Sequence, residues 1–214
     1  RMVENYNAQA VGDDIDNDPT KISWSSDLLA DVRRGRIHEF KKDLIYPGAY
    51  RPFTKQYAYF DRPLNERVYQ LEKIFPTPQH ENVGVLVTSP GGNAPFTALC
   101  VKNVPDLVSV TGAGNAAQFF PRWTYEKVSA DDGLFAASSG EVDEYGYRRL
   151  DNITDEILAV YREKFGPQVS KDDIFHYVYG VLHSQQYREV FAADLKRMLP
   201  RIPLAASSAD FPAF

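Results

Sequence analysis

Three residues near the start of the sequence, Asp31, Glu39 and Lys41, have the types that a metal-dependent nuclease uses. Two carboxylates can hold Mg²⁺ while a lysine steadies the attacking water. That chemistry requires Glu and Lys on a rigid strand. Here they follow Gly35 in a highly charged stretch without clean alternation, which favours a solvated surface. The nuclease site is therefore the less favoured alternative.

A second candidate is the segment "VSVTGAGNAA", which follows an expected strand and carries Gly112, Gly114 and Ala117. This spacing is close to the dinucleotide fingerprint, in which glycines let a pyrophosphate approach the backbone. Pro121 leaves too little room for the helix that must follow. The segment is better explained as a Gly-rich turn, and we expect no bound nucleotide.

Histidine and cysteine offer no further chemistry. The histidines never form a His-x-x-x-His or His-x-Glu pattern, and Cys100 is the single cysteine, so we expect no metal site. His176 and His183, seven residues apart, would share one face of an expected helix, where ordinary core or surface roles are commoner. P-loop and Gly-x-Ser-x-Gly motifs are absent from the sequence. We expect a non-catalytic chain.

Aromatic and basic residues alternate in "AYRPFTKQYAYFDRPLNERVYQ", residues 49–70. Rings can stack on bases and cations can contact phosphates, which suits a nucleic-acid surface. Tyr and Phe can equally fill a β-core while Arg and Lys lie on its wet side. Composition alone favours the core interpretation and leaves the other open.

Charge is distributed unevenly along the chain. The net charge of −5 counts against nucleic-acid binding if it is spread evenly. Residues 28–73 hold ten Lys and Arg against six Asp and Glu, whereas residues 129–176 hold five against eleven. The first half can thus present a cationic face, although ordinary fluctuation explains so small a bias about as well. No stretch is long and apolar enough for a bilayer, so we expect a soluble protein.

The order of patterns predicts a mixed α/β fold of the α+β type, with a β-rich lobe before a helical lobe. Residues 1–22 are polar and turn-rich and indicate a connecting segment. The expected lobe over residues 23–128 begins with a short helix that Ser26 or Asp27 caps and Gly35 ends. Two strands around a turn follow over residues 42–60, then a brief helix before Pro76. Three β-branched runs, "VGVLVTSP", "TALCVKNVP" and "DLVSVTG", predict strands.

The pattern changes after Pro121. Residues 129–150 are acidic and Gly-rich and predict a long exposed loop. Residues 151–214 predict a helical lobe, with Ser170 and Asp173 as a capping box for its second helix. "QQYREVFAADLKRMLP" predicts a third helix. The abrupt ends of the chain suggest a piece excised from a longer protein and truncated at its C-terminus.

The segments "YRPFTKQYAYFD", "LNERVYQ", "IFPTP", "VPDL", "FFPRWTYE" and the tail from Asp173 to Leu204 together resemble the C-terminal specificity domain of Type ISP restriction-modification enzymes. The resemblance runs from about Ile22 to Leu204. In that family a nuclease, a superfamily 2 helicase-translocase and an adenine-N6 methyltransferase precede this domain. Their motifs are absent here, so the resemblance implies a target-recognition domain that acts on double-stranded DNA in the bacterial cytoplasm as part of phage defence.

The resemblance also implies partners and cofactors. The upstream methyltransferase and helicase domains would be partners, and the parent protein would use S-adenosylmethionine, ATP and Mg²⁺, with none bound to this fragment, which we expect to be monomeric. A protein-docking module without base contacts stays open as an alternative function, with the helical tail as its surface.

Two groups of residues are candidates for contact with DNA, one for its phosphates and one for its bases. Phosphate contacts are expected from the basic residues Arg33, Arg34, Arg36, Lys41, Lys42, Arg51 and Arg62. Stacking of Arg51 and Arg62 on Tyr57 or Phe60 is an equally good explanation for those two. Asn93, Asn115 and Gln118 lie in expected loops beside the sheet, where amides can reach base edges, although a simple role in loop turns is as probable for each.

Overall fold

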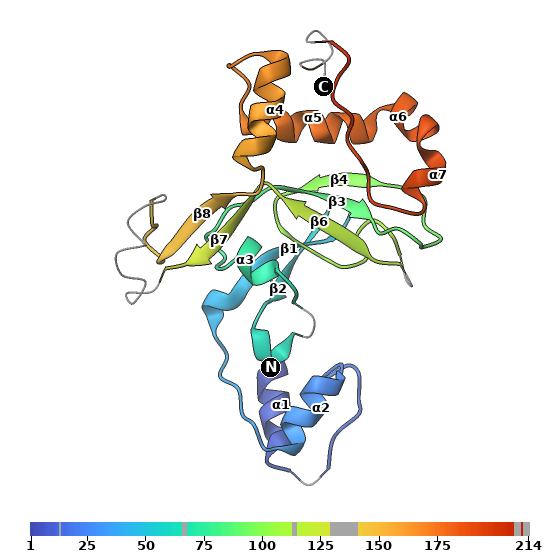
Figure 1. Cartoon of the computed structure of the whole chain (residues 1–214). Coiled ribbons are helices and arrows are strands. Elements are labelled where there is room, and N and C mark those ends of the chain that lie inside the picture. The colour runs from blue at the N-terminus through green and yellow to red at the C-terminus, as the bar shows by residue number, and fades with distance from the viewer. Residues whose placement is uncertain (13, 66–67, 113–114, 129–140, 208–210, 212–214) are drawn as a thin grey trace.

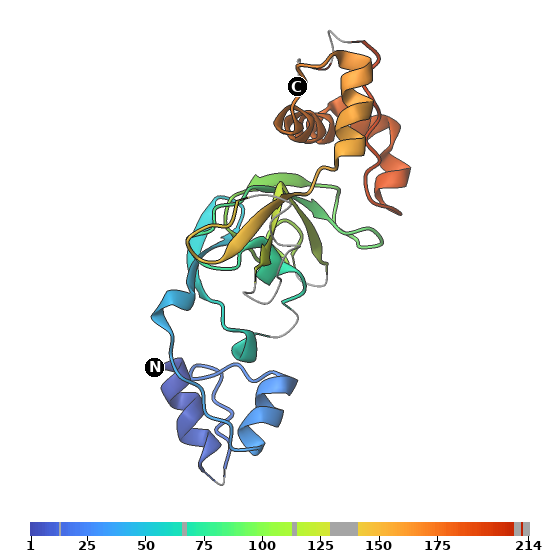
Figure 2. The same cartoon turned by 60° about the vertical axis from the view of Figure 1, so that its left-hand side comes forward.

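The computed structural model describes residues 1–12, 14–65, 68–112, 115–128, 141–207 and 211. An N-terminal pair of helices lies at one end, a β-rich region lies in the middle, and four helices lie at the other end (Figures 1 and 2). The expected mixed α/β class is confirmed. Within the described parts of the chain, no helix is long and apolar enough to cross a membrane.

The N-terminal helical pair consists of α1 (Met2–Ala10) and α2 (Ser26–Arg33). Tyr6, which is 1% exposed, packs in a small core with buried residues of the loop and of α2. Residues 1–22, interpreted as a connecting segment, therefore contain a helix that belongs to a packed unit. The polar stretch after α1 concealed the short apolar face of that helix. Ser25, rather than Ser26 or Asp27, accepts the capping hydrogen bond of α2.

The first sheet has the order β2-β1-β5 and contains both parallel and antiparallel pairs. β1 (Ile45–Arg51) and β2 (Thr54–Tyr59) form an antiparallel hairpin, and β5 (Val104–Pro105) pairs with β1 in parallel. The two expected strands are confirmed. The tip of the hairpin is Pro52-Phe53, because Arg51 pairs with Thr54.

The second sheet has the antiparallel order β4-β3-β6, and β7 and β8 form a separate pair. The strands are β3 (Gly84–Thr88), β4 (Ala98–Val101), β6 (Ala117–Pro121), β7 (Trp123–Lys127) and β8 (Tyr147–Asp151). Every residue of β3 is buried, as its run of β-branched residues predicts. Part of the expected acidic loop is therefore strand β8, and residues 129–140 lie outside the described residues.

The expected strand over "DLVSVTG" is wrong, because residues 106–111 form turns after β5. The Asp106 carboxylate accepts the backbone N–H of Val108, and the Ser109 hydroxyl donates to the backbone carbonyl of Asp106. Local bonds of this kind compete with a strand ladder. Gly112 then adopts a positive φ of 98°. Side-chain hydrogen bonding thus overrides the β-branched pattern.

Three short helical elements lie before β1 and between β2 and β3. The brief helix expected before Pro76 is α3 (Leu71–Ile74), and single 3-10 turns occupy Lys42–Leu44 and Arg62–Leu64. Ile74 packs with Tyr46 of the hairpin in a second small core. This core lies under the inner face of the hairpin.

The C-terminal helices are α4 (Asp155–Phe165), α5 (Lys171–His183), α6 (Gln185–Val190) and α7 (Ala192–Leu195). The Ser170 and Asp173 capping box is confirmed. The expected third helix is divided between α6 and α7. The largest core joins these helices to β3 and β4, so the two expected lobes share one hydrophobic interior.

A buried arginine ties this helical layer to the β-rich region. Arg122, between β6 and β7, forms an ion pair with Asp151 at the end of β8 and another, at 2.7 Å, with Asp172 of α5. Lys171 lies 3.3 Å from the second oxygen of Asp151. Hydrogen bonds from Arg122 and Lys171 outweigh partial burial and lower the pKa of Asp151. The network joins the ends of β6 and β8 to the start of α5.

Candidate nucleic-acid interface

The β1–β2 hairpin has one inner and one outer face. Side chains alternate along a strand, so Lys55, Tyr57 and Tyr59 share a face, while Tyr46 of β1 points the other way into the core. Tyr57 is 84% exposed, and Tyr59 is half-buried against Phe40, whose ring centroid lies 5.3 Å away. The aromatic segment is thus core on its inner face and open surface on its outer face.

The hairpin tip carries its most exposed aromatic residue. Phe53 is 96% exposed and has a φ of 64°, in the left-handed region. It directly follows Pro52, in a position where a type II turn normally has Gly. Lys55 and Tyr57 form a surface that we call the hairpin outer face, and Phe53 lies in the turn at its end. The sequence raised the whole segment as a possible nucleic-acid surface but did not single out these three residues, although strict alternation from the buried Tyr46 separates the two faces.

Arg51 holds the base of this tip. Its guanidinium forms an ion pair with Asp106 at 3.1 Å and lies 4.2 Å from the centroid of the Tyr50 ring. Ser109 donates a hydrogen bond to the backbone carbonyl of Ala49 at 2.7 Å. Arg51 therefore stacks on Tyr50, rather than on Tyr57 or Phe60, and its charge is partly compensated. The hairpin base and the turns over residues 106–111 are firmly joined.

Two of the three amide candidates lie together at one edge of the second sheet. The Asn115 side-chain oxygen accepts the backbone N–H of Asn93 at 2.9 Å, and the Thr111 hydroxyl donates to the Asn115 backbone carbonyl. A Cβ on Gly92 would lie 2.3 Å from that Asn115 oxygen, so a larger residue there would displace the Asn115 side chain. Asn115 thus joins two loops, while the Asn93 side chain is exposed.

Gln118 lies apart from these loops. It belongs to β6, where it pairs with Val87, and it is partly exposed. The expectation that Gln118 lies in a loop is therefore wrong, because the strand begins at Ala117. Gly114 of the candidate dinucleotide fingerprint lies outside the described residues, and the element after it is strand β6 rather than the helix that such a site requires.

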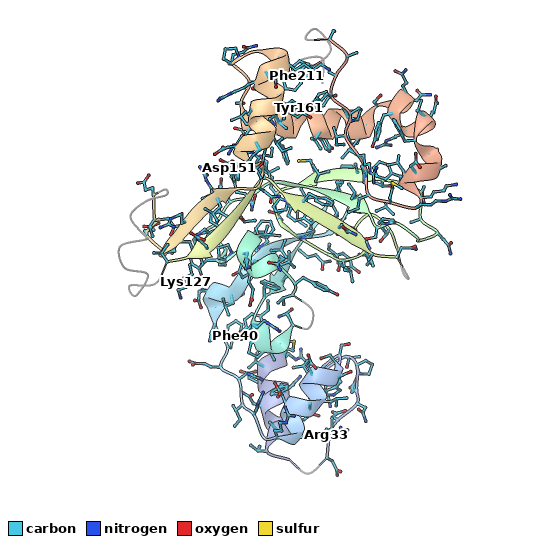
Figure 3. All side chains as sticks on the ribbon, viewed as in Figure 1. Arg33, Phe40, Lys127, Asp151, Tyr161 and Phe211 are labelled. Carbon is cyan, nitrogen blue, oxygen red and sulfur yellow. The ribbon has the colours of Figure 1, made fainter. Side chains whose placement is uncertain are left out.

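The basic residues divide between two regions. Arg33, Arg34 and Arg36 lie on or just after α2 in the N-terminal helical pair, where Figure 3 labels Arg33. Arg36 and Arg34 lie 2.8 Å and 3.7 Å from the Asp31 carboxylate, which compensates part of their charge. Arg33 is exposed.

The remaining cations lie nearer to the hairpin. Lys41 and Lys42 lie at the start of the 3-10 turn that leads into β1, and Phe40 beside them stacks on Tyr59 of the hairpin. Both lysines and Arg62, in the 3-10 turn after β2, are exposed. These positions provide cations at the end of the hairpin opposite its tip.

The nuclease alternative finds no support in this geometry. Asp31 lies on α2 and is paired with arginines, while Glu39 and Lys41 lie in an irregular segment rather than on a strand. The backbone N–H of Lys41 donates to the Tyr59 hydroxyl. Among the described residues, no group of three or more His, Cys, Asp and Glu side chains is placed to hold a metal ion.

His80 is buried, and hydrogen bonds to both of its ring nitrogens give it a structural role. His80 lies 2.8 Å from the Asp143 carboxylate through Nε2 and 2.7 Å from the Thr77 hydroxyl through Nδ1. The rings of Tyr125 and Tyr147 meet it edge-on. The Asp143 carboxyl loses some hydration, but hydrogen bonds from backbone N–H groups and from His80 lower its pKa. These contacts hold the segment that leads into β8.

Exposed aromatic side chains can stack on bases and exposed cations can contact phosphates, so the hairpin and the positions around it suit a nucleic-acid surface. A family model of the Type ISP C-terminal specificity domain matches residues 1–214, and the chain belongs to this family. The expected family and its function in DNA target recognition are confirmed. No curated protein matches the chain.

Two similar solved structures are DNA complexes. The chain is 29% identical to a cryoEM structure of a DrdV–DNA complex, with a TM-score of 0.79 over 99% of this chain and 19% of that one. It is 33% identical to a nuclease-deletion mutant of the Type ISP restriction-modification enzyme LlaGI in complex with a DNA substrate mimic, with a TM-score of 0.75. That match covers 99% of this chain and 18% of the LlaGI chain. The chain therefore spans about a fifth of the length of these structures.

Proposed function

We propose that this domain reads its DNA target with the loops at the edge of the second sheet, and that it lends specificity to a larger enzyme. The loops over residues 89–97 and 106–116 flank the paired ends Thr88 and Ala117 of β3 and β6. Loops held on a rigid sheet can present side chains to base edges at fixed positions. The DNA complexes of the similar structures support this assignment.

The observation that carries the proposal is the contact between Asn115 and Asn93. Asn115 uses its side-chain oxygen to hold the neighbouring loop, which leaves the exposed Asn93 amide pointing from a fixed backbone. An amide can bond two edge atoms of adenine in the major groove. Asn93 is therefore the first candidate reader, and Asn115 is a positioning residue.

The phosphate contacts are assigned to exposed cations. Arg33, Lys41, Lys42 and Arg62 supply affinity without sequence choice. Arg34, Arg36 and Arg51 contribute less, because Asp31 and Asp106 compensate them.

The enzymatic steps are assigned to other parts of the parent protein. An adenine-N6 methyltransferase, a helicase-translocase and a nuclease upstream of this domain would use S-adenosylmethionine, ATP and Mg²⁺ in the bacterial cytoplasm. The domain itself would act as a monomeric, non-catalytic unit within that chain. Ile157 and Val160 on α4 are 46% and 45% exposed and offer an apolar surface for those upstream domains.

Methylation by the parent enzyme tests the reading loops. The recognised site is first identified by methylome sequencing, and rates are then measured on that site and on every single-base variant. Asn93→Ala should lower discrimination at one base pair by about 5- to 150-fold, which corresponds to about 1–3 kcal/mol. Gln186→Ala, an exposed amide on α6, is the matched control and should leave selectivity unchanged. Unchanged selectivity for Asn93→Ala would reject the reading role.

A further inference from the structure

The end of the β1–β2 hairpin extends beyond the packed part of its sheet. Four consecutive residues of β2, Thr54 to Tyr57, are exposed, so neither face of the strand is covered there. On the other side of β1, pairing with β5 reaches only Gly48 and Ala49. The last residues of the hairpin therefore form a two-stranded arm in solvent.

The arm holds an aromatic ring in a conformation that aromatic residues rarely adopt. Phe53 has a φ of 64° and its ring is almost wholly exposed, so no packing compensates the backbone strain. Glycine is the default residue for such a position. A strained residue of this kind is retained where it serves a function, and a bare ring at a hairpin tip is suited to contact a partner.

The charge of the arm favours DNA over a protein as that partner. Residues 44–60 contain no Asp or Glu, although the whole chain carries 29 of them, and Lys55 stands on the hairpin outer face two residues from the tip. Lysine is depleted in protein interfaces, whereas Lys and Arg neutralise the phosphates of bound DNA. Lys41 and Lys42 lie at the other end of the hairpin, where the Tyr59 hydroxyl donates to the Asp61 carboxylate, so the lysine next to the tip is Lys55.

An ion pair and a backbone hydrogen bond connect the arm to the proposed reading loops. Arg51 binds Asp106, and the next residue, Leu107, accepts a backbone hydrogen bond from Ala117 at the start of β6. The loop that contains Asn115, and that holds Asn93 through its side chain, ends at this same position. A duplex that lies against the loops therefore has the hairpin arm as its neighbour on the protein surface.

We propose that the hairpin arm is a DNA wedge, in which Phe53 inserts its ring between two stacked base pairs and Lys55 binds an adjacent phosphate. This inference rests on the proposed function and adds a contact that is independent of sequence. A phenyl ring carries no hydrogen-bonding group, so it gains from DNA only by stacking or apolar contact. Apolar wedges of this kind unstack a base step and bend the duplex. Tyr57, on the same face as Lys55, lies against the sugar-phosphate backbone.

Fluorescence of 2-aminopurine tests the wedge directly, because this base brightens when it loses a stacked neighbour. The parent enzyme is titrated, without cofactors, onto duplexes that carry the identified site and a single 2-aminopurine at successive positions. The wild-type protein should brighten the probe at one step. Phe53→Ala should abolish that signal and weaken binding to every sequence by about 5- to 150-fold, the contribution of one stacked aromatic. Phe53→Leu keeps an apolar wedge and should retain part of the signal.

The controls separate this inference from the proposed function. Val190→Ser removes an exposed apolar side chain on α6, in the C-terminal helical layer, and should change neither signal nor affinity. A wild-type enzyme that shows sequence preference but gives no probe signal, or a Phe53→Ala variant with unchanged signal and affinity, overturns the wedge alone. A wild-type enzyme with no sequence preference overturns the proposed function.

Discussion

Replacement of Phe53 by glycine should stabilise the fold while it weakens DNA binding. The left-handed conformation costs a residue with a Cβ about 1–2 kcal/mol. Glycine avoids that cost but loses about 0.5–1 kcal/mol through the greater freedom of the unfolded chain. Phe53 is 96% exposed, so neither Gly nor Ala loses packing there. The difference between the midpoints of these two ranges makes Phe53→Gly more stable than Phe53→Ala by about 0.7 kcal/mol.

Thermal unfolding of the 214-residue chain measures this difference. For a chain of this size, about 1 kcal/mol shifts the unfolding temperature by about 2–4 °C, so Phe53→Gly should unfold about 1–3 °C above Phe53→Ala. Both variants lack the ring and should lose DNA affinity equally in the parent enzyme. If Phe53→Ala were as stable as Phe53→Gly, the tip would not be strained and the argument from its conformation would fail.

Three further predictions concern charges and loops. Arg33→Ala and Lys42→Ala should each weaken binding to all sequences alike and flatten the salt dependence of affinity by about one unit of slope, and an unchanged slope would remove that residue from the phosphate contacts. The folded state lowers the pKa of Asp151, so its stabilising contribution is complete above the unfolded pKa of about 3.9 and disappears as the pH falls through the folded pKa. Thermal melts of Asp151→Asn, which keeps an oxygen for Arg122, should show less loss of stability on acidification than the wild type, and parallel acid profiles would contradict the coupling. Asn115→Ala releases the hydrogen bond between two loops and should reduce methylation selectivity at several base pairs rather than one, whereas a loss confined to one pair would identify Asn115 as a reader.

Elements with strong local signals could be predicted from the sequence. The capped helix α5 and the β-branched strand β3 follow from Ser170 with Asp173 and from "VGVLV". The segment after Pro105 could not be predicted this way, because Asp106 and Ser109 form local hydrogen bonds that the β-branched pattern conceals. Local pattern alone also did not indicate that α1 would pack on α2, which depends on contacts between distant segments.

The candidate nucleic-acid interface could be predicted only in part from the sequence. Residue types located Asn93 and Asn115, but the hydrogen bond that gives them different roles depends on the fold. The aromatic segment raised two interpretations, a packed core and a nucleic-acid surface, and the strand register confirms the core for one face and leaves the surface as a prediction for the other. Tyr46 belongs to the core, whereas Phe53 and Tyr57 face solvent. Composition cannot make that division, because it depends on which partner strand covers which face.

A domain exchange tests the central claim, that this chain chooses the DNA sequence, most directly. Residues 1–214 replace the equivalent segment of a Type ISP enzyme with a known methylated motif, and the methylome of cells that carry the hybrid gene is sequenced. Recombinants are first selected for restored adenine methylation, so that only folded hybrids are compared. We predict that the methylated motif changes to that of the protein from which this chain derives. A hybrid that methylates the recipient's original motif would contradict the account.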